Sequence, residues 1–296
     1  MIEGIFVEGL IYSIMALGVF FTFRILDFPD LTVDGSFPLG AVIMAACLHQ
    51  NVNPVAGLFT ALAGGILAGI VTAEIHNRLK VPHLLAGILT MTMLYSVNIR
   101  ILSNRANLPL LRVDTIITHI HRWSEGILTP EWASLIFFIL VVFFIKKTMD
   151  LFFITDMGLL FGALGNNEQM VRTQGVNPAV LKSIGVGLSN GLVALSGAFA
   201  AQYQGFADVN LGQGIVVSGL ASVMLGEFLL KSNRISILTL RVVLGAILFK
   251  AIMYLGRYYG YYINMTPNDL KLIAGILIII SLAVANLRNK KEKGLA

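Results

Sequence analysis

The sequence predicts an all-α membrane protein of about nine transmembrane helices, arranged as two inverted repeats with broken helices. Three observations predict it: the composition, a series of apolar runs, and an internal repeat. Of the 296 residues, 56% are hydrophobic and only 12% are charged, and the mean hydropathy is +0.82. A soluble domain carries about 25% charged residues. The composition therefore excludes an ordinary soluble enzyme, a disordered chain and a small disulfide scaffold.

Nine apolar runs are candidates for the crossings. A spanning helix needs about 20 mostly apolar residues, and fewer where neighbouring helices shield its ends. The eighth run contains Arg241 and Lys250. We expect that helix to be buried against others, with Lys250 extended towards the interface and Arg241 paired with an acid such as Glu227. The runs are 5–26, 35–50, 54–73, 84–99, 132–145, 183–207, 209–226, 235–255 and 272–287.

The basic residues predict the orientation. With the C-terminus in the cytoplasm and the N-terminus outside, 13 Lys and Arg flank the cytoplasmic ends of the runs and six flank the outer ends. This asymmetry follows the positive-inside rule, which also explains the net charge of +5 without a nucleic-acid partner. Glu3 and Glu8 stand where a cleaved signal peptide would carry basic residues. Cys47 is the single cysteine and has no disulfide partner in the chain.

The internal repeat has an offset of 178 residues. It aligns 9–31 with 187–209, with seven of 23 positions identical, and both copies end in Phe-x-Asp, at Asp30 and Asp208. The copies cross the membrane in opposite directions, so the repeats are inverted. Chance similarity in a helical scaffold is the alternative. The chain is then one transmembrane domain, 1–296, with repeat one at about 5–101, a connector helix at 130–147, a cytoplasmic segment at 155–178 and repeat two at about 180–287.

Each repeat is interrupted by a polar, glycine-bearing break after its first helix. Polar backbone at membrane depth is tolerated only where it is buried in protein or lines a cavity, so the breaks predict a translocation path. The alternative for Asp30 and Asp34 is that they cap the following helix. Helix N-termini at the breaks would favour a carboxylate-bearing substrate, and hence an amino acid over a neutral sugar. The candidate path residues are Asp30, Thr32, Asp34, Ser36, Asp208, Asn210 and Gln213.

The segment 155–187 is too polar at its start to span, and it follows the basic pair Lys146 and Lys147. We expect it on the cytoplasmic side as two short helices around a glycine turn, with Gly165 and Gly175 allowing the turns and with Asn177 and Pro178 beginning the next span. A short helix projecting into the cytoplasm favours docking of a soluble partner, with Glu168 paired to a basic residue of that partner. The candidate coupling residues are Gly162, Gly165, Asn166, Asn167, Glu168, Arg172 and Gly175.

Several of these motifs carry a family resemblance. ALGNNEQMVRTQGVN (163–177), SNGLVALSGAFAAQYQGFADVNLGQGIVVSGLASVMLGE (189–227) and DLTVDGS (30–36) resemble the permease subunits of ABC importers for ribose, nucleosides, autoinducer and branched-chain amino acids. The resemblance covers most of the chain. The ribose-type permeases usually carry an extra N-terminal helix, which is absent here. PDLTVDGSFPLGA (29–41) is most similar to a small subgroup whose partners resemble aromatic amino-acid binding proteins.

The resemblance implies a multi-pass subunit of the bacterial cytoplasmic membrane. Two copies would form a homodimer in lipid, dock an ATPase through 162–177 and receive substrate from an external binding protein. Independently of the family, the chain contains no G-x-x-x-x-G-K-[ST] motif, so ATP would be hydrolysed by a partner. Neither a Ser-His-Asp set nor a pair of carboxylates is found within one plausible pocket. We therefore expect neither enzymatic activity nor a cofactor. The alternative is an ion-coupled secondary transporter, in which intramembrane Asp and Arg would relay protons.

Two further patterns have structural interpretations. His119 and His121 form an H-x-H pair, which is too few ligands for a metal site, so we expect a solvated loop. The aromatic run 257–265 is typical of an interfacial belt. Gly57, Gly64, Gly65 and Gly69 favour close helix packing.

Overall fold

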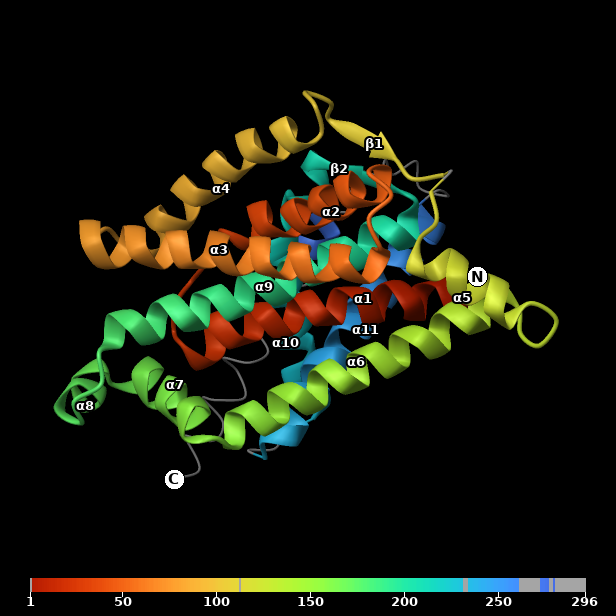
Figure 1. The fold of residues 1–296 in the computed structure, drawn as a ribbon. Helices are drawn as coiled ribbons and strands as arrows, with labels where there is room; N and C mark the ends of the chain where they lie inside the picture. The colour runs from red at the N-terminus through yellow and green to blue at the C-terminus, as the bar shows by residue number, and fades with distance from the viewer. Residues whose placement is uncertain (1, 112, 231–233, 261–271, 277–278, 280–296) are drawn as a thin grey trace.

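The computed structural model describes residues 2–111, 113–230, 234–260, 272–276 and 279, and Figure 1 shows their arrangement. The predicted ninth crossing and the second half of the aromatic run lie mostly outside these residues. The helices are α1 (Ile2–Phe20), extended by a π-helical turn η1 (Phe21–Ile25), α2 (Val33–His49), α3 (Pro54–Leu79), α4 (His83–Ile101), α5 (Ile116–Ser124), α6 (Pro130–Ile154), α7 (Asp156–Asn166), α8 (Glu168–Thr173), α9 (Pro178–Gln204), α10 (Ile215–Leu229) and α11 (Ile235–Gly260).

A small antiparallel sheet joins two distant loops. Its strands are β1 (Asn107–Pro109) and β2 (Phe206–Asp208), with Asn107 opposite Asp208. A 3-10 turn η2 (Val209–Gly212) leads from β2 into α10. The second break is therefore fixed to the loop that follows α4.

The helices agree with the apolar runs but do not establish nine crossings. Among the described residues, six helices are long and apolar enough to span a membrane, and α2 is a shorter apolar helix. The run predicted at 132–145 lies within α6, which has 25 residues. The count of about nine and the inversion of the repeats remain predictions.

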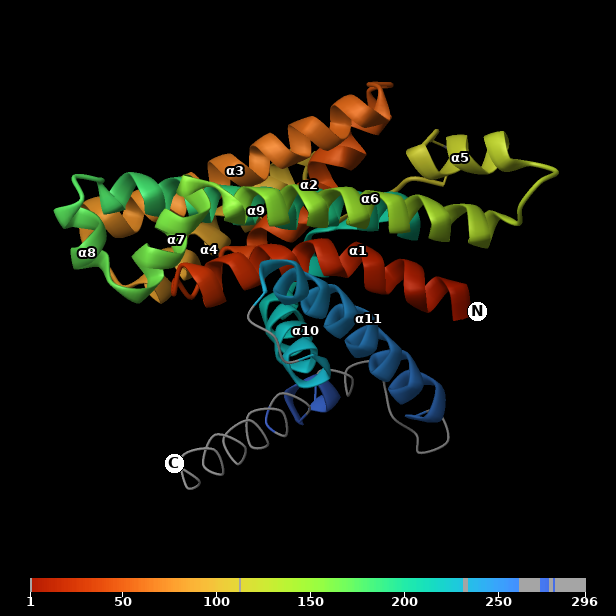
Figure 2. The same cartoon turned by 90° about the horizontal axis from the view of Figure 1, so that it is seen from below.

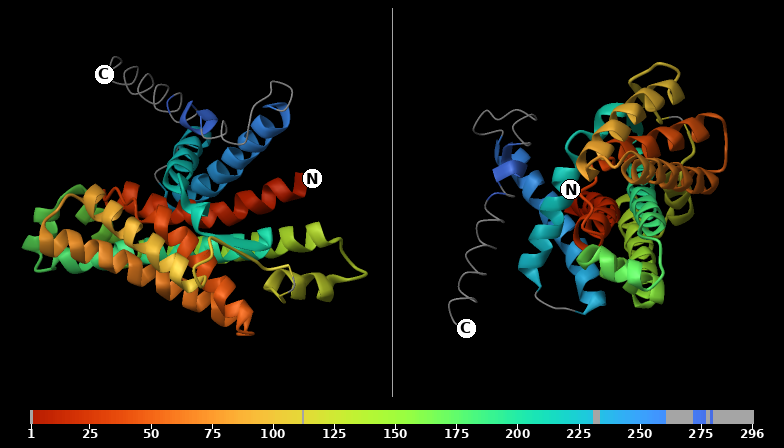
Figure 3. Two further views of the ribbon diagram at one scale, coloured as in Figure 1. Left: turned by 90° about the horizontal axis from the view of Figure 1, so that it is seen from above. Right: turned by 90° about the vertical axis from the view of Figure 1, so that its left-hand side faces the viewer.

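The core forms around α1 and α9, which lie side by side (Figures 1 and 3). Both helices are apolar around most of their circumference, as expected for helices surrounded by protein. Two serines of α9 hydrogen-bond to α1: Ser189 Oγ donates to the carbonyl of Gly18 and Ser196 Oγ to that of Ile11, both at 2.7 Å. These bonds satisfy buried hydroxyl groups and fix the register of the two helices.

The predicted glycine packing is found between α3 and α9. A Cβ at Gly65 or Gly69 would collide with the carbonyl groups of Asn190 or Val186 on α9. On the same helix, Gly57 and Gly64 face side chains of α2. Small residues let the backbones approach closely, which is how helices associate in lipid.

Helices α10 and α11 point away from the layer of helices that contains α1, α3, α6 and α9 (Figure 2). The predicted pair is present, with Arg241 donating to Glu227 at 3.0 Å, and Arg24 lies 3.2 Å from the same carboxylate. Lys250 pairs with Glu8 at 3.3 Å and lies 3.3 Å from the centre of the Tyr12 ring. Ion pairs therefore join α11 both to α10 and to α1.

The N-terminus and the predicted cytoplasmic segment lie at opposite ends of the molecule, which either orientation requires, so the direction of insertion stays a prediction. The N-terminus and α5 lie at one end, whereas α7 and α8 lie at the other (Figures 1 and 2). A chain with its N-terminus outside and its 155–178 segment in the cytoplasm requires this separation.

Candidate functional site

The first break is a buried polar cluster that we call the first-break cluster: Asp30, Thr32, Ser36, Thr72 and Asn190. The Asp30 carboxylate accepts the backbone N–H of Thr32 at 2.8 Å and the Asn190 amide at 2.6 Å. The Asn190 carbonyl accepts the Ser36 hydroxyl at 2.7 Å, and the hydroxyls of Thr32 and Thr72 are 2.7 Å apart. All five residues are 0% exposed. Every polar group of the cluster thus has a partner, as burial requires.

The second break contains the same turn, in which an aspartate accepts the backbone N–H two residues ahead, but some of its residues are exposed. The Asp208 carboxylate accepts the backbone N–H of Asn210 at 2.7 Å, as Asp30 does with Thr32. The other Asp208 oxygen accepts the Asn107 amide at 3.3 Å, across the small sheet. Asn210 and Gln213 are exposed, and the Gln213 amide donates to Asn210 at 3.3 Å. The second break is therefore accessible, whereas the first is packed inside the protein.

The two breaks meet through Asp34. Its carboxylate accepts the backbone N–H groups of Gly214 at 3.1 Å and Val216 at 2.8 Å. Asp34 thus caps α10 and not the helix that follows it, which corrects the capping alternative for this residue. The carboxylate also occupies the α10 N-terminus, where a substrate carboxylate was expected. A Cβ at Gly212 would overlap the Asp34 carbonyl oxygen, so the two backbones are in direct contact.

Helices α2 and α10 are short, and α10 reaches the 21 residues of a candidate span only together with η2 (Val209–Leu229). They have 17 and 15 residues, against 26 in α3 and 27 in α9. At about 1.5 Å per residue they extend about 25 and 22 Å, whereas a hydrocarbon core is about 30 Å thick. Each helix would therefore need residues of its break to complete a crossing.

A cavity lies where the two breaks meet; we call it the junction cavity. Its volume is about 370 Å³, and it lies between the N-terminal turn of α2, one face of α4 and the residues that precede α10. Of the predicted path residues, Asp34 and Gln213 line it, whereas Asp30, Thr32 and Ser36 contact protein instead. The lining residues are Asp34, Gly35, Pro38, Met91, Thr92, Tyr95, Asn98, Val209, Gln213 and Gly214.

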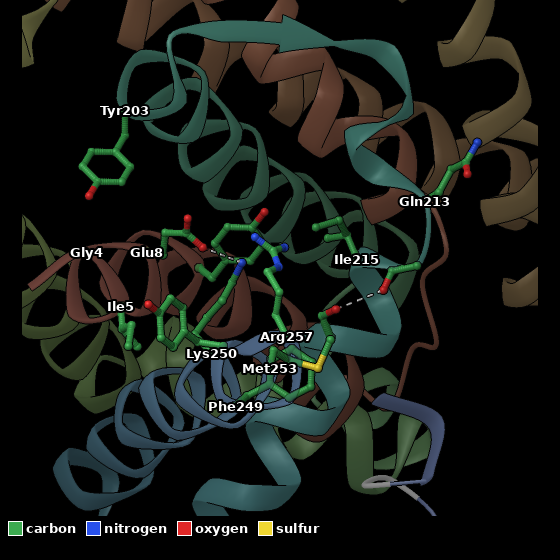
Figure 4. Close-up of a pocket in the computed structure, with 14 residues that line it drawn as sticks. Gly4, Ile5, Glu8, Tyr203, Gln213, Ile215, Phe249, Lys250, Met253 and Arg257 are labelled. Carbon is green, nitrogen blue, oxygen red and sulfur yellow. Dashed lines mark hydrogen bonds and ion pairs between the residues drawn. The ribbon is translucent and has the colours of Figure 1, made fainter. Parts of the chain in front are cut away.

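A second cavity of about 320 Å³ lies on the other side of the α10 N-terminus, among α1, α9, α10 and α11. Figure 4 shows Glu8 paired with Lys250 within it, and Arg257 and Met253 on the same helix as Lys250. Gln213 and Gly214 line both cavities. The residues at the start of α10 thus lie between the junction cavity and this second cavity.

The predicted coupling segment forms two short helices, α7 and α8. The glycine turn was placed wrongly: Gly165 lies inside α7, where a Cβ would collide with the Ile25 carbonyl, and the helices separate at the extended residue Asn167. The Asn167 side chain caps α8 by accepting the N–H of Met170 at 3.2 Å. Gly175, with φ +81°, forms the turn after α8.

Glu168 is engaged within the chain. Its carboxylate accepts Lys182 at 2.8 Å and Arg172 at 3.2 Å. The hydrogen bond from Lys182, opposed by partial burial and aided by the charges of both cations, holds the pKa of Glu168 below its usual value. Within this chain the carboxylate thus already has two cations as partners, and its pairing with another subunit stays a prediction. Gly162, Asn166 and Arg172 are exposed at this end of the molecule.

Sequence reasoning missed Asn190, Thr72, Asn98 and Tyr95. Asn190 and Asn98 are polar residues within apolar helices and are almost fully buried. A buried amide in a membrane helix needs a partner, so both could have been singled out from the sequence. Their partners could not, because they come from distant helices.

The H-x-H pair is not part of a metal site in the part of the chain that the structure describes, where no group of three metal-ligating side chains occurs. The His121 ring lies 2.8 Å from the Ser134 hydroxyl, which joins α5 to α6.

Residues 1–282 match the family described as the permease component of branched-chain amino acid transport systems. The chain belongs to this family. The prediction from the sequence motifs is thereby confirmed.

Individual relatives refine the picture. The permease is 39% identical to a tyrosine transport system permease protein of Clostridioides difficile (strain R20291), over 99% of this chain and 94% of that protein. It is 26% identical to the ribose import permease protein RbsC of Escherichia coli (strain K12), over 67% of this chain and 60% of that protein. A solved metal-chelate type ABC transporter, in an inward-facing conformation, has a TM-score of 0.47 at 16% identity, covering 98% of this chain and 86% of that chain.

Membership of the family settles the broad function. The permease is a multi-pass protein of the bacterial inner membrane and a subunit of an ABC transporter, and it is not an enzyme. ATP hydrolysis takes place on a separate ATPase subunit, and the family implies a substrate-binding protein as a second partner. The family favours this function over the ion-coupled alternative.

Proposed function

We propose that this permease is the transmembrane subunit of an ATP-driven importer that receives an amino acid from an external binding protein and passes it to the cytoplasm. The observation that carries the proposal is the junction cavity, formed where the N-termini of two short helices meet. Short or broken helices in corresponding positions of two halves mark the binding sites of many transporters. The similarity to a tyrosine transport permease supports an amino acid as the substrate.

We propose that the two halves are inverted repeats. The pair Asp30 and Thr32 and the pair Asp208 and Asn210 are 178 residues apart and make the same side-chain to backbone bond. In each half a long helix precedes the break and a short one follows it. Repeat one would occupy about 5–101, repeat two about 180–287, with the helix at 130–147 between them.

Within this frame the predicted path residues have different roles. Asp34 and Gln213 line the junction cavity, and Asp208 and Asn210 lie on the accessible side next to the small sheet. Asp30, Thr32 and Ser36 stabilise the start of α2 from inside the protein. The path would therefore run past α4 and the start of α10.

Helices α7 and α8 form the proposed dock for the ATPase. Gly162 is exposed on α7, and a Cβ there would meet no atom within 4 Å. Gly162→Arg should therefore leave the fold intact and reduce substrate-stimulated ATP hydrolysis by the complex. Gln50→Arg, at the exposed end of α2, is the matched control. Equal ATPase activity in the two variants would place the dock elsewhere.

The complex is proposed to contain two copies of the permease in lipid. Cyclic pairs are the commonest oligomers, and α4 exposes large apolar residues such as Leu84, Leu85 and Met93 that need lipid or a second copy as their surroundings. Native mass spectrometry of the detergent-solubilised complex should give two permease chains. A single copy, or a second and different permease, would contradict the homodimer.

The function itself is tested by uptake. Proteoliposomes that contain the permease and its ATPase, with the binding protein added outside, should accumulate radiolabelled L-tyrosine only when ATP is enclosed. An ATPase variant unable to hydrolyse ATP is the control. Uptake driven by a proton gradient without the ATPase would instead support the ion-coupled alternative.

A further inference from the structure

Asn98 brings an unpaired acceptor to the junction cavity. This residue of α4 is 1% exposed, and its amide nitrogen donates to the Gly35 carbonyl at 3.3 Å. Its side-chain oxygen has no hydrogen-bond partner in the described part of the chain, although Asn98 lines the cavity. A buried acceptor without a donor is costly. The cavity is thus expected to receive a hydrogen-bond donor at this point.

The charged group in the cavity wall also favours a ligand that donates hydrogen bonds. Among the described residues that line it, Asp34 is the charged one and none is Lys or Arg. The Asp34 carboxylate accepts backbone N–H groups of Gly214, Ile215 and Val216, and a carboxylate has about four acceptor positions, so one position remains. Asp34 adjoins Gly35, to which Asn98 is bonded, so both acceptors belong to one end of the cavity.

Most donors in the wall are already used. The Thr92 hydroxyl donates to the Leu89 carbonyl at 2.8 Å, and the Gln213 amide donates to Asn210. The wall therefore offers acceptors and a negative charge, but no cation, which is the complement of an ammonium group.

The remainder of the wall is apolar. Pro38 and Met91 line it, together with the half-exposed ring of Tyr95. A thioether and an aromatic ring both favour contact with another ring. The volume of about 370 Å³ lies in the range of about 300–1,000 Å³ seen for small-molecule sites.

We propose that the junction cavity binds the ammonium group of an amino acid in transit, with Asn98 and Asp34 as acceptors and Tyr95 and Met91 in contact with an aromatic or large apolar side chain. The inference rests on the proposed import of amino acids. The cavity provides no cation for the α-carboxylate, so that group faces the opening. A carboxylate without an ammonium group is repelled by Asp34.

The test distinguishes binding through the ammonium group of the ligand from binding through its carboxylate. The purified complex of permease and ATPase in lipid nanodiscs, without ATP or binding protein, is equilibrated with radiolabelled L-tyrosine. Three competitors are added: tyramine, which lacks the carboxylate; 3-(4-hydroxyphenyl)propanoate, which lacks the ammonium group; and ribose. We expect tyramine to displace the label at concentrations at least about tenfold lower than the propanoate does, a difference that one charged hydrogen bond readily gives. Displacement by the propanoate at equal or lower concentration, or none by tyramine, would overturn the proposal.

Variants of Asn98 test whether tyramine binds at this residue. Asn98→Leu removes the acceptor and should weaken tyramine binding at least about tenfold. Asn98→Asp keeps an acceptor at the same place and should retain tyramine binding, which distinguishes loss of the acceptor from loss of the fold. Thr148→Val, at an exposed hydroxyl of α6 bonded to Phe144, is the control. Unchanged tyramine binding in Asn98→Leu would contradict the site.

Uptake measured on the same preparations separates this inference from the proposed function. If Asn98→Leu takes up L-tyrosine at the normal rate and tyramine does not bind the wild type, the site is wrong and the function stands. If tyramine binds through Asn98 but the wild-type complex imports no amino acid, the site stands and the function is wrong.

Discussion

The two breaks contain the same turn in opposite surroundings. In both, an aspartate accepts the backbone N–H two residues ahead, at 2.8 Å for Asp30 and 2.7 Å for Asp208. Asp30 is 0% exposed and its carboxylate is bonded to Asn190, whereas the second break is accessible and Asp208 is bonded to Asn107 of a surface strand. The repeat therefore determines the local geometry, and neighbouring helices determine whether it is buried.

The reason for the difference lies on the facing helix. Asn190 of α9 supplies an amide to the first break. The residue at the same repeat position is Tyr12 of α1, which lies under Lys250 and lines the other cavity. No amide thus reaches the second break from α1. One break is fixed inside the protein, and the other is left free to meet solvent or substrate.

The largest expected effect comes from removing that amide. Asn190→Leu would leave the Asp30 carboxylate with Thr32 as its remaining partner and the Ser36 hydroxyl with none, so we expect a loss of about 3 kcal/mol in the free energy of unfolding. Asn210→Ala, in the accessible break, should cost less than about 0.5 kcal/mol. Thermal unfolding in detergent measures both. Equal losses would mean that the two breaks do not differ in burial.

Two glycines test how closely the breaks touch. Gly212→Ala would force a Cβ against the Asp34 carbonyl and the Pro38 ring, and we expect a cost of about 2–3 kcal/mol. Gly214→Ala meets no atom within 4 Å and bears only the strain of φ +81°, about 1 kcal/mol. The same unfolding assay compares them. A larger loss for Gly214→Ala would contradict direct contact between the breaks.

Substitution of Asp34 should lower stability less, and only at the start of α10. Asp34→Asn keeps one side-chain acceptor for the two N–H groups of Gly214 and Val216, so about 1 kcal/mol should be lost at the start of α10. Hydrogen exchange at these two amides should become about fivefold faster, while exchange in α9 is unchanged. Asp208→Asn is the matched control, because its carboxylate caps only the short η2 turn. Unchanged exchange at both amides in Asp34→Asn would mean that this carboxylate does not cap α10.

The smallest effect lies outside both breaks, at Glu168. Its pKa is lowered in the folded protein, so its contribution to stability is fully present above about pH 4.5 and is lost as the pH falls through the lower, folded value. Because the pair with Arg172 is exposed, Glu168→Gln should cost less than about 0.5 kcal/mol at neutral pH and remove this acid dependence. Unfolding measured between pH 3 and 7 at low salt would detect it. An unchanged acid dependence in the variant would exclude Glu168 as its source.

Patterns that act over a few residues were predictable. The apolar runs located the long helices, the offset of 178 aligned Asp30 with Asp208, and Asn177 was correctly placed at the start of α9. Close packing at Gly65 and Gly69 was also expected, because small residues on one helix face require a near neighbour.

Contacts between distant segments were not predictable in the same way. Asp34 is a suitable cap for its own helix, and nothing in its neighbourhood shows that it caps a helix 182 residues ahead, at Val216. Gly165 resembled a turn residue but is required by the approach of the Ile25 carbonyl. Glu168 resembled a free surface acid until the fold brought Lys182 beside it.

The glycine contacts of α9 have a mechanical consequence. A Cβ at Gly40 of α2 would overlap the Ala194 carbonyl, one at Gly197 would overlap that of Phe37, and Gly65 and Gly69 attach α3 in the same way. Backbones packed this closely cannot slide past one another without losing contact along their whole length, so α2, α3 and α9 form one rigid block. The pair α10 and α11 extends away from this block (Figure 2), but it is bonded to α2 where Asp34 caps α10, and it also packs along α1, where a Cβ at Gly9 would lie 2.9 Å from Ile247. A tilt of the pair relative to the block would have to break the bonds from Gly214 and Val216 to Asp34, so the meeting point of the two breaks also holds α10 and α11 in place.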